Sequence, residues 1–169
     1  MKITLWPETS PTRDGMPMMR NPKFWPIEYW SALYGILSEK HEAMICYREM
    51  KILDGFEKIH VPTIKDAESA MRWSDLVISV DSYPIHLANS LMVPAVAIWQ
   101  ITDPETYGYL HHWNVTPMNH QPREGKKKWM AFYSHEWKAC NIPTLLEVHE
   151  VVQEAIQSLD QGKSFRSDS

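Results

Sequence analysis

The chain has 169 residues, of which 44% are hydrophobic. This length is enough for one well-buried domain and short for two. A net charge of −4 and a pI near 6.0 supply no overall positive charge for binding nucleic acid. No apolar stretch approaches the ~20 residues that a membrane-spanning helix needs. We therefore expect a cytoplasmic protein without a membrane span.

Strands and helices alternate along the first third of the chain. Lys2–Trp6 predicts a first strand, and the proline-containing stretch 7–25 predicts a long loop. Loops of that length inside compact domains are usually functional or mobile. Apolar residues at helical spacing predict a helix over Pro26–Lys40, and a strand follows near Ala43–Tyr47. We expect a short helix or turn at 48–57.

The rest of the chain continues this pattern with one irregular part. Lys58–Val61 predicts a brief strand, and Thr63–Ser74 predicts an amphipathic helix. Residues 100–142 are irregular in pattern, with an edge strand predicted at Trp129–Tyr133. A last helix is predicted over Thr144–Leu159. The charged tail, 161–169, is expected to fray.

The segment 75–104 is the most informative part of the sequence. Leu76–Val80 is an apolar run with β-branched residues, and the polar turn Asp81–Tyr83 ends it. Pro84 suits the first turn of a helix. A second apolar strand, Pro94–Trp99, follows at the distance that a βαβ crossover needs.

This order predicts an α/β fold with one Rossmann-like, doubly wound, mostly parallel sheet over residues 1–160. With the usual strand order 3-2-1-4-5, the first strand lies beside Leu76–Val80. Ligands of such sheets bind beyond the carboxyl ends of the strands, and the free N–H groups of a helix start favour phosphate. Residues expected to face one another across this crevice are Thr9, Ser10, Lys23, Ser82 and His86.

The same residues carry a family resemblance. Asp-Ser-Tyr-Pro-Ile-His-Leu-Ala (81–88) is followed by Val-Pro-Ala-Val-Ala (93–97) and by Thr-Asp-Pro (102–104). This order resembles the C-terminal, donor-binding half of the ADP-heptose:lipopolysaccharide heptosyltransferases, which have the two-domain GT-B fold. Lys23–Trp30 is similar to that family's Lys-x-Trp-Pro segment, and Ile3–Pro7 to the strand before it. The resemblance covers nearly the whole chain.

The resemblance implies that the crevice binds a nucleotide diphosphate or a nucleotide sugar. Lys23 would neutralise the diphosphate, and Ser82 and His86 would donate to it. Asp81 would orient the turn or accept from a sugar hydroxyl. The structural alternatives are a surface lysine, a turn aspartate and a structural helix histidine.

Weaker matches extend this site. Glu49 is placed like a family carboxylate that holds the nucleotide ribose, although the local spacing is shortened. Thr63 and Ile64 lie where the family's backbone meets the base. Thr102 and Asp103 close the far side, where a simple turn explains them equally well. The resemblance assigns no catalytic residue to this chain.

The histidines and cysteines of the sequence show no pattern typical of a metal site or of a reactive thiol. Histidines with ligand potential are His111, His112, His120 and His135. They form no tight ligand pattern, so we predict no metal site and no cofactor besides the nucleotide ligand. Cys46 and Cys140 lack metal spacing and are expected to be free thiols. The basic run Lys126–Lys128 is interpreted as a solvated loop rather than a phosphate patch.

Two departures from the family matter. Tyr83 stands where the family has a glycine close to phosphate, so its ring narrows the pocket or stacks on another ligand. The sequence also contains no counterpart of the half that binds acceptor and supplies the general base. Transfer would need a partner half or a symmetric assembly, and whether the chain is an enzyme stays open.

The leading hypothesis is thus a heptosyltransferase-like donor domain. The alternatives are a non-catalytic protein that sequesters a nucleotide-derived ligand, and a degenerate scaffold whose Trp- and Met-rich surface binds protein. Trp25 and Trp30 fit either a core or a partner-facing surface. Self-association is predicted, because an open cleft would leave apolar side chains around it. These side chains are Trp6, Met16, Met18, Met19 and Tyr83.

Overall fold

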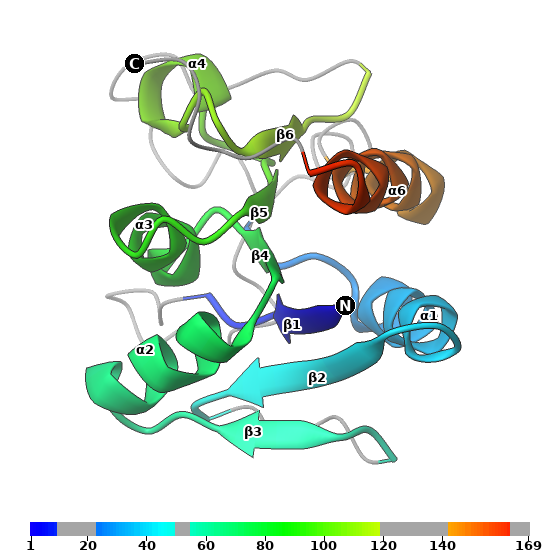
Figure 1. Cartoon of the computed structure of the whole chain (residues 1–169). Helices are drawn as coiled ribbons and strands as arrows, with labels where there is room; N and C mark the ends of the chain where they lie inside the picture. The colour runs from blue at the N-terminus through cyan, green and yellow to red at the C-terminus, as the bar shows by residue number, and fades with distance from the viewer. Residues whose placement is uncertain (10–22, 50–54, 119–141, 163–169) are drawn as a thin grey trace.

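The computed structural model describes residues 1–9, 23–49, 55–118 and 142–162. Its strands are β1 (Lys2–Trp6), β2 (Glu42–Tyr47), β3 (Lys58–His60), β4 (Leu76–Val80), β5 (Ala95–Ile98) and β6 (Trp113–Val115). They form one six-stranded parallel sheet in the order β3-β2-β1-β4-β5-β6 (Figure 1). The predicted order of the first five strands is confirmed.

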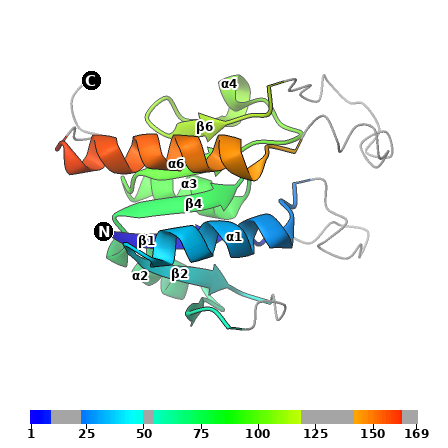
Figure 2. The same cartoon turned by 90° about the vertical axis from the view of Figure 1, so that its right-hand side faces the viewer.

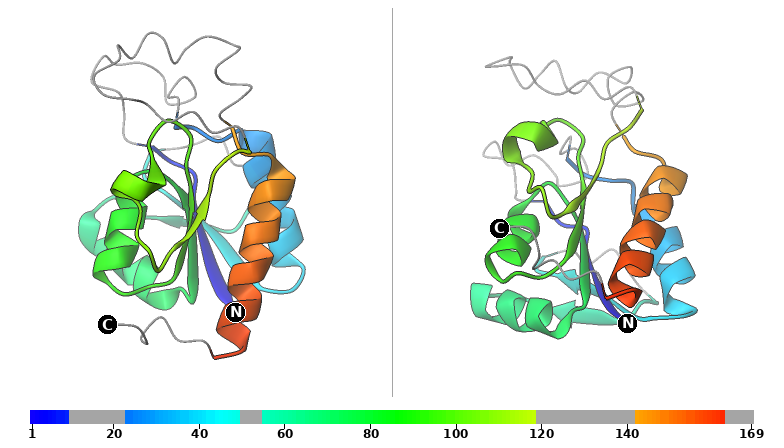
Figure 3. Two further views of the ribbon diagram at one scale, coloured as in Figure 1. Left: turned by 90° about the horizontal axis from the view of Figure 1, so that it is seen from above. Right: turned by 45° about the horizontal axis from the view of Figure 1, so that its top comes forward.

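Helices cover both faces of this sheet. They are α1 (Ile27–Ser38), α2 (Ile64–Trp73), α3 (Tyr83–Ser90), α4 (Pro104–Tyr107) and α6 (Leu145–Asp160). Helices α1 and α6 pack on one face, and α2 and α3 pack on the other (Figures 2 and 3). This arrangement confirms the predicted doubly wound α/β fold. Within the described parts of the chain, no helix combines enough length and apolar character to cross a membrane.

The two helix layers explain why the central strands are apolar at every position. All residues of β4 and of β5 are buried, as expected for parallel strands covered on both faces. Trp25 and Trp30 are fully buried in the core beneath α1 and α6. The Trp25 indole N–H donates to the carbonyl of Pro143 at 2.7 Å, which ties the start of α1 to the start of α6. These two tryptophans are therefore core residues.

The sixth strand, β6, was not predicted from the sequence. Trp113–Val115 lies in a segment that was predicted to be irregular, yet it pairs with β5 at the sheet edge. Its run is short and interrupted by Asn114 within a stretch rich in His, Pro and Asn, so no strand pattern stands out. The predicted strand Trp129–Tyr133, the basic run Lys126–Lys128 and Cys140 lie outside the described residues.

The strand order brings the segments after β1 and β4 together. Trp6 pairs with Ser79 in the register of these two strands. The Ser79 hydroxyl donates to the Trp6 carbonyl at 3.2 Å, and the Ser82 hydroxyl donates to the Glu8 carbonyl at 3.2 Å. The switch point of the sheet thus lies between β1 and β4, where the sequence predicted it.

Candidate functional site

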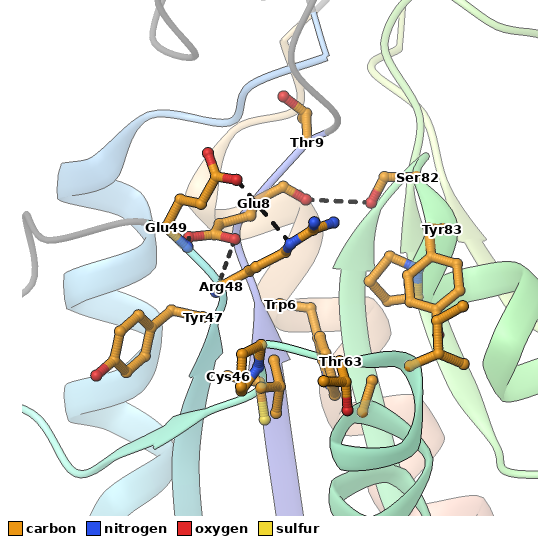
Figure 4. Close-up of a pocket in the computed structure, with 15 residues that line it drawn as sticks. Trp6, Glu8, Thr9, Cys46, Tyr47, Arg48, Glu49, Thr63, Ser82 and Tyr83 are labelled. Atoms are coloured by element: carbon orange, nitrogen blue, oxygen red, sulfur yellow. Dashed lines mark hydrogen bonds and ion pairs between the residues drawn. The ribbon is translucent and has the colours of Figure 1, made fainter.

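A pocket of about 470 Å³ opens at the carboxyl edge of the sheet, beyond β1 and β2 and beside the first turns of α2 and α3 (Figure 4). Its apolar lining includes Trp6, Cys46, Val61 and Ala67. Trp6 is only 4% exposed, and its indole N–H donates to the Thr4 hydroxyl at 3.0 Å. The prediction that Trp6 stands exposed around an open cleft is therefore wrong, because its ring packs among buried residues beneath α2 and α3.

Cys46 is a free, buried thiol, as the sequence predicted. Burial raises the pKa of this thiol far above its usual range. The side chain therefore remains protonated and acts as a small apolar group in the pocket wall.

Glu8 joins the three strand ends that border the pocket. Its carboxylate accepts from the backbone N–H of Arg48 at 2.8 Å and from that of Glu49 at 2.9 Å. Its carbonyl accepts from the Ser82 hydroxyl, so the ends of β1, β2 and β4 are linked through one residue (Figure 4). Next to it, Thr9 is 4% exposed, and its hydroxyl has no hydrogen-bond partner among the described residues. Buried hydroxyls are normally paired, which makes Thr9 a candidate ligand contact.

The two helix starts at the pocket differ in how they are capped. Thr63 caps α2, and a reciprocal capping box with Asp66 satisfies donors of its first turn. Ser82 caps α3 without a side-chain hydrogen bond to that helix, because its hydroxyl donates to Glu8 instead. The start of α3 thus faces the pocket without a capping side chain.

Tyr83 forms part of the pocket wall and is 40% exposed. Partial burial raises the pKa of its hydroxyl, and the nearby Glu68 carboxylate adds to this shift. Among the described non-glycine residues only Met92 has a positive φ, so a tyrosine at this position imposes no backbone strain. Its ring occupies space that a glycine would leave open.

A separate cluster, Lys23–Asp81–Thr102, lies at the ends of β4 and β5. Lys23 Nζ lies 2.5 Å from Asp81 Oδ2, and the Thr102 hydroxyl donates to the same carboxylate oxygen. Asp81 is 4% exposed, so this is a largely buried ion pair. The Gln100 side-chain amide donates to the Lys23 carbonyl at 3.0 Å, which holds the lysine backbone in place.

His86 is not part of the pocket lining. Its Nδ1 lies 2.9 Å from the Tyr109 hydroxyl, and the rings of His111 and His112 pack around the same tyrosine. Burial lowers the pKa of His112 to about 4, and the neighbouring His111 and His86 add to this shift. Asp103 caps α4 by accepting from the backbone N–H of Glu105 at 2.9 Å.

The structure thus divides the predicted site residues into two groups. Those that line the pocket are Thr9, Glu49, Thr63, Ser82 and Tyr83. Those that lie outside its lining are Lys23, Asp81, His86, Thr102 and Asp103. Ser10 lies outside the described residues. Ligand contact by the members of either group stays a prediction.

Glu8 and Arg48 line the pocket but were not singled out by the sequence analysis. A signal for Glu8 was present, because it stands two residues beyond the first predicted strand, on the switch-point side of the sheet. No comparable pattern marks Arg48, whose backbone N–H, rather than its side chain, meets Glu8.

The described residues contain no cluster of side chains suited to a metal ion. Across 1–9, 23–49, 55–118 and 142–162, no three His, Cys, Asp or Glu side chains are grouped so that they could hold an ion. The imidazoles of His86, His111 and His112 instead pack on Tyr109. This part of the chain therefore presents no fitted metal centre.

Comparison with known proteins agrees with the motif residues. The model of glycosyltransferase family 9 (heptosyltransferase) matches residues 61–132, which contain the run Asp81–Ala88. This match confirms the resemblance to the heptosyltransferases. No curated protein sequence matches the chain.

Solved heptosyltransferases share the fold. The iron-containing, dodecameric glycosyltransferase TibC from enterotoxigenic E. coli H10407 matches with a TM-score of 0.69 and 15% identity, over 95% of this chain and 47% of TibC. TibC in complex with ADP-D-β-D-heptose matches with a TM-score of 0.69 and 15% identity, over 95% and 46%. E. coli heptosyltransferase WaaC with ADP matches with a TM-score of 0.60 and 16% identity, over 92% and 44%. The chain therefore spans less than half the length of each of these enzymes.

Proposed function

We propose that the pocket binds a nucleoside diphosphate or its sugar conjugate, and that the chain acts as the donor-binding half of a heptosyltransferase-like glycosyltransferase. The observation that carries this proposal is the meeting of an apolar-lined pocket with the uncapped start of α3. A base fits the apolar lining, and a diphosphate fits the positive end of a helix. TibC has been solved with ADP-D-β-D-heptose and WaaC with ADP, which supports the same class of ligand here.

The pocket suggests one orientation for such a ligand. The base would lie beside Val61 and Thr63, and the ribose would lie toward Glu49. The diphosphate would approach Ser82 and the first turn of α3, with the Thr9 hydroxyl as a further donor. In this orientation the charged end of the ligand points toward the cluster Lys23–Asp81–Thr102.

In sugar transfer, the role of this chain would be to bind the donor and to stabilise the leaving diphosphate. The bond between the sugar and the diphosphate breaks, an acceptor hydroxyl attacks the sugar carbon, and the diphosphate departs with the bonding electrons. The positive end of α3 would stabilise the charge that develops on the leaving group. Lys23 would add a donor to the phosphate, although its charge is partly neutralised by Asp81, whose carboxylate lies 2.5 Å away.

The general base would come from outside these 169 residues. The chain covers less than half of TibC and of WaaC, so we propose that groups beyond these 169 residues, in an acceptor half or in a second copy, complete the site. The dodecameric state of TibC makes self-assembly a reasonable form of completion. Light scattering at micromolar concentration tests this step, and a monomeric mass without a partner half would contradict the self-assembly form.

A second function is favoured by Tyr83 alone. A ring in the pocket wall, where the family has glycine, suits a rebuilt site that sequesters a nucleotide-derived ligand without transfer. The tryptophan part of the scaffold hypothesis loses support, because Trp6, Trp25 and Trp30 are buried rather than exposed. Met16, Met18 and Met19 lie outside the described residues.

Calorimetry with ADP, UDP, GDP and their sugar conjugates tests the proposed function. Micromolar binding of at least one of them is expected, together with competition between the diphosphate and its sugar conjugate. Mass spectrometry of ligand released from purified, gently denatured protein identifies the native occupant. If no nucleotide binds and none is released, the proposed function is wrong.

A further inference from the structure

The backbone at the end of β2 forms an anion site that the chain fills with its own carboxylate. The N–H groups of Arg48 and Glu49 point to the two carboxylate oxygens of Glu8, at 2.8 and 2.9 Å. Consecutive backbone N–H groups that converge in this way bind phosphates and carboxylates in many proteins. Glu8 reaches this position from the end of β1, 40 residues away in the sequence from Arg48.

A second donor set at the pocket is filled in the same manner. At the start of α2, the Asp66 carboxylate accepts from the Thr63 backbone N–H at 3.2 Å and from its hydroxyl at 2.6 Å. The start of α3 has no such internal carboxylate, because its cap residue Ser82 donates to Glu8. Of the three donor sets around the pocket, two therefore carry negative charge from the chain itself.

We propose that Glu8 determines the specificity of this pocket by reserving the β2 end for an uncharged ribose. The inference rests on the proposed function and extends it. A nucleotide with free ribose hydroxyls can donate to Glu49 beside Glu8, whereas a phosphate on the ribose meets two carboxylates. The pocket would thus accept nucleoside 5′-diphosphates and reject nucleotides that carry a further phosphate on the 3′ oxygen.

Among the described residues, Arg48 forms an ion pair with Glu49. Its guanidinium Nε lies 3.9 Å from Glu49 Oε1, and both side chains are mostly exposed, at 68% and 62%. An exposed pair at this distance is screened by water and salt. The Glu8 carboxylate is held by backbone donors instead, so its charge stays at a defined place in the pocket.

The test compares two ligands and three forms of the protein. The ligands are the tightest binder among ADP, UDP and GDP and the same nucleotide with a 3′-phosphate. The proteins are the native chain, Glu8→Ala and the control Glu42→Ala, which removes an exposed carboxylate at the opposite end of β2. The native chain and Glu42→Ala should prefer the unmodified diphosphate by about tenfold or more, since like charges at an interface disfavour the wrong partner. Glu8→Ala should reduce that preference several-fold.

Equal binding of both nucleotides by the native chain would overturn the inference while leaving the proposed function intact. The same holds if Glu8→Ala keeps the full preference and its thermal melt shows a folded protein. Failure of every nucleotide to bind would instead refute the proposed function, and with it the ribose selection.

A second measurement judges the anion site without any nucleotide. Inorganic phosphate should raise the melting temperature of Glu8→Ala more than that of the native chain or of Glu42→Ala, because it can occupy the vacated donors of residues 48 and 49. Identical phosphate effects on all three proteins would show that Glu8 does not fill an anion site.

Discussion

The two sides of the β4 carboxyl end use similar residues in different ways. On the β5 side, Lys23 and Thr102 both bind the Asp81 carboxylate, and Asp81 is 4% exposed. On the β1 side, Thr9 is equally buried, but its hydroxyl has no hydrogen-bond partner among the described residues. The start of α3 on this side lacks a side-chain cap.

This difference separates stabilising groups from groups that are available to a ligand. A lysine and an aspartate that are bound to each other largely neutralise each other's charge, so each has less charge to offer a phosphate or a sugar. A buried hydroxyl without a partner gains a hydrogen bond when a ligand arrives. We therefore expect substitutions on the β5 side to affect mainly the stability of the fold, and those on the β1 side to affect mainly ligand binding.

The largest expected effect is on stability, from Asp81→Ala. This change leaves the Lys23 ammonium and the Thr102 hydroxyl without their shared acceptor, and we expect a loss of about 2–4 kcal/mol in the free energy of unfolding. Urea unfolding measures it. The control is Asp103→Ala, which removes the cap of the short helix α4 and should cost about 1 kcal/mol. Equal losses in the two variants would contradict the distinction between the two sides.

The β5 side should also make stability depend on pH. His112 has a folded pKa of about 4, so between pH 6.5 and 4 the unfolded chain binds a proton that the folded chain does not. Stability therefore falls as pH drops through this window, by up to about 3 kcal/mol, and it is unaffected by this group above it. Urea unfolding at several pH values gives the free energy of unfolding of the native chain and of His112→Phe. The contribution of His112 is the difference between the two proteins in how steeply this free energy changes with pH. Parallel slopes would show that His112 does not couple to folding.

Tyr83→Gly distinguishes the two proposed functions on the β1 side. In a working donor domain the ring only narrows the pocket, and its removal should keep or improve affinity for the nucleotide sugar. In a rebuilt site the ring stacks on the ligand, and its loss should cost about 1–3 kcal/mol of binding. Calorimetry gives the affinity, and a parallel thermal melt controls for the greater backbone freedom of glycine. Weaker binding with an unchanged melt would rule out the simple donor domain.

The smallest expected effect comes from Thr9→Val, which keeps the shape of the side chain and removes its hydroxyl. We expect a loss of about 0.5–1.5 kcal/mol in nucleotide binding without a loss of stability, because this hydroxyl has no partner among the described residues. Thr106→Val is the matched control on the β5 side, where the hydroxyl donates to Asp103 at 3.0 Å. That variant should bind normally. If the Thr9→Val protein binds nucleotide normally but melts at a lower temperature, the Thr9 hydroxyl stabilises the fold and is not a ligand contact.

The sequence was informative wherever a local pattern reflects burial. Apolar runs of four to six residues between polar turns are what a sheet covered on both faces requires, and they predicted β1, β2, β4 and β5 to within about a residue. From the alternation of strands and helices, the strand order and the switch point followed, and with them the pocket edge that holds Thr9, Ser82 and Tyr83. The three-residue strand β6 was missed, because its pairing with β5 rather than its own pattern makes it a strand.

Tertiary structure alone decided which polar groups meet. Lys23 and Asp81 are 58 residues apart, and Glu8 and Arg48 are 40 residues apart, so no local spacing predicts either contact. The strand order brings their segments to one sheet edge, and the side chains then pair by charge and reach. Residue type could place Lys23 and Ser82 together as phosphate contacts, but only the folded chain shows that the lysine is bound to a carboxylate while the serine lines the pocket. The physical reason is that burial forces polar groups to find partners, and those partners are set by topology.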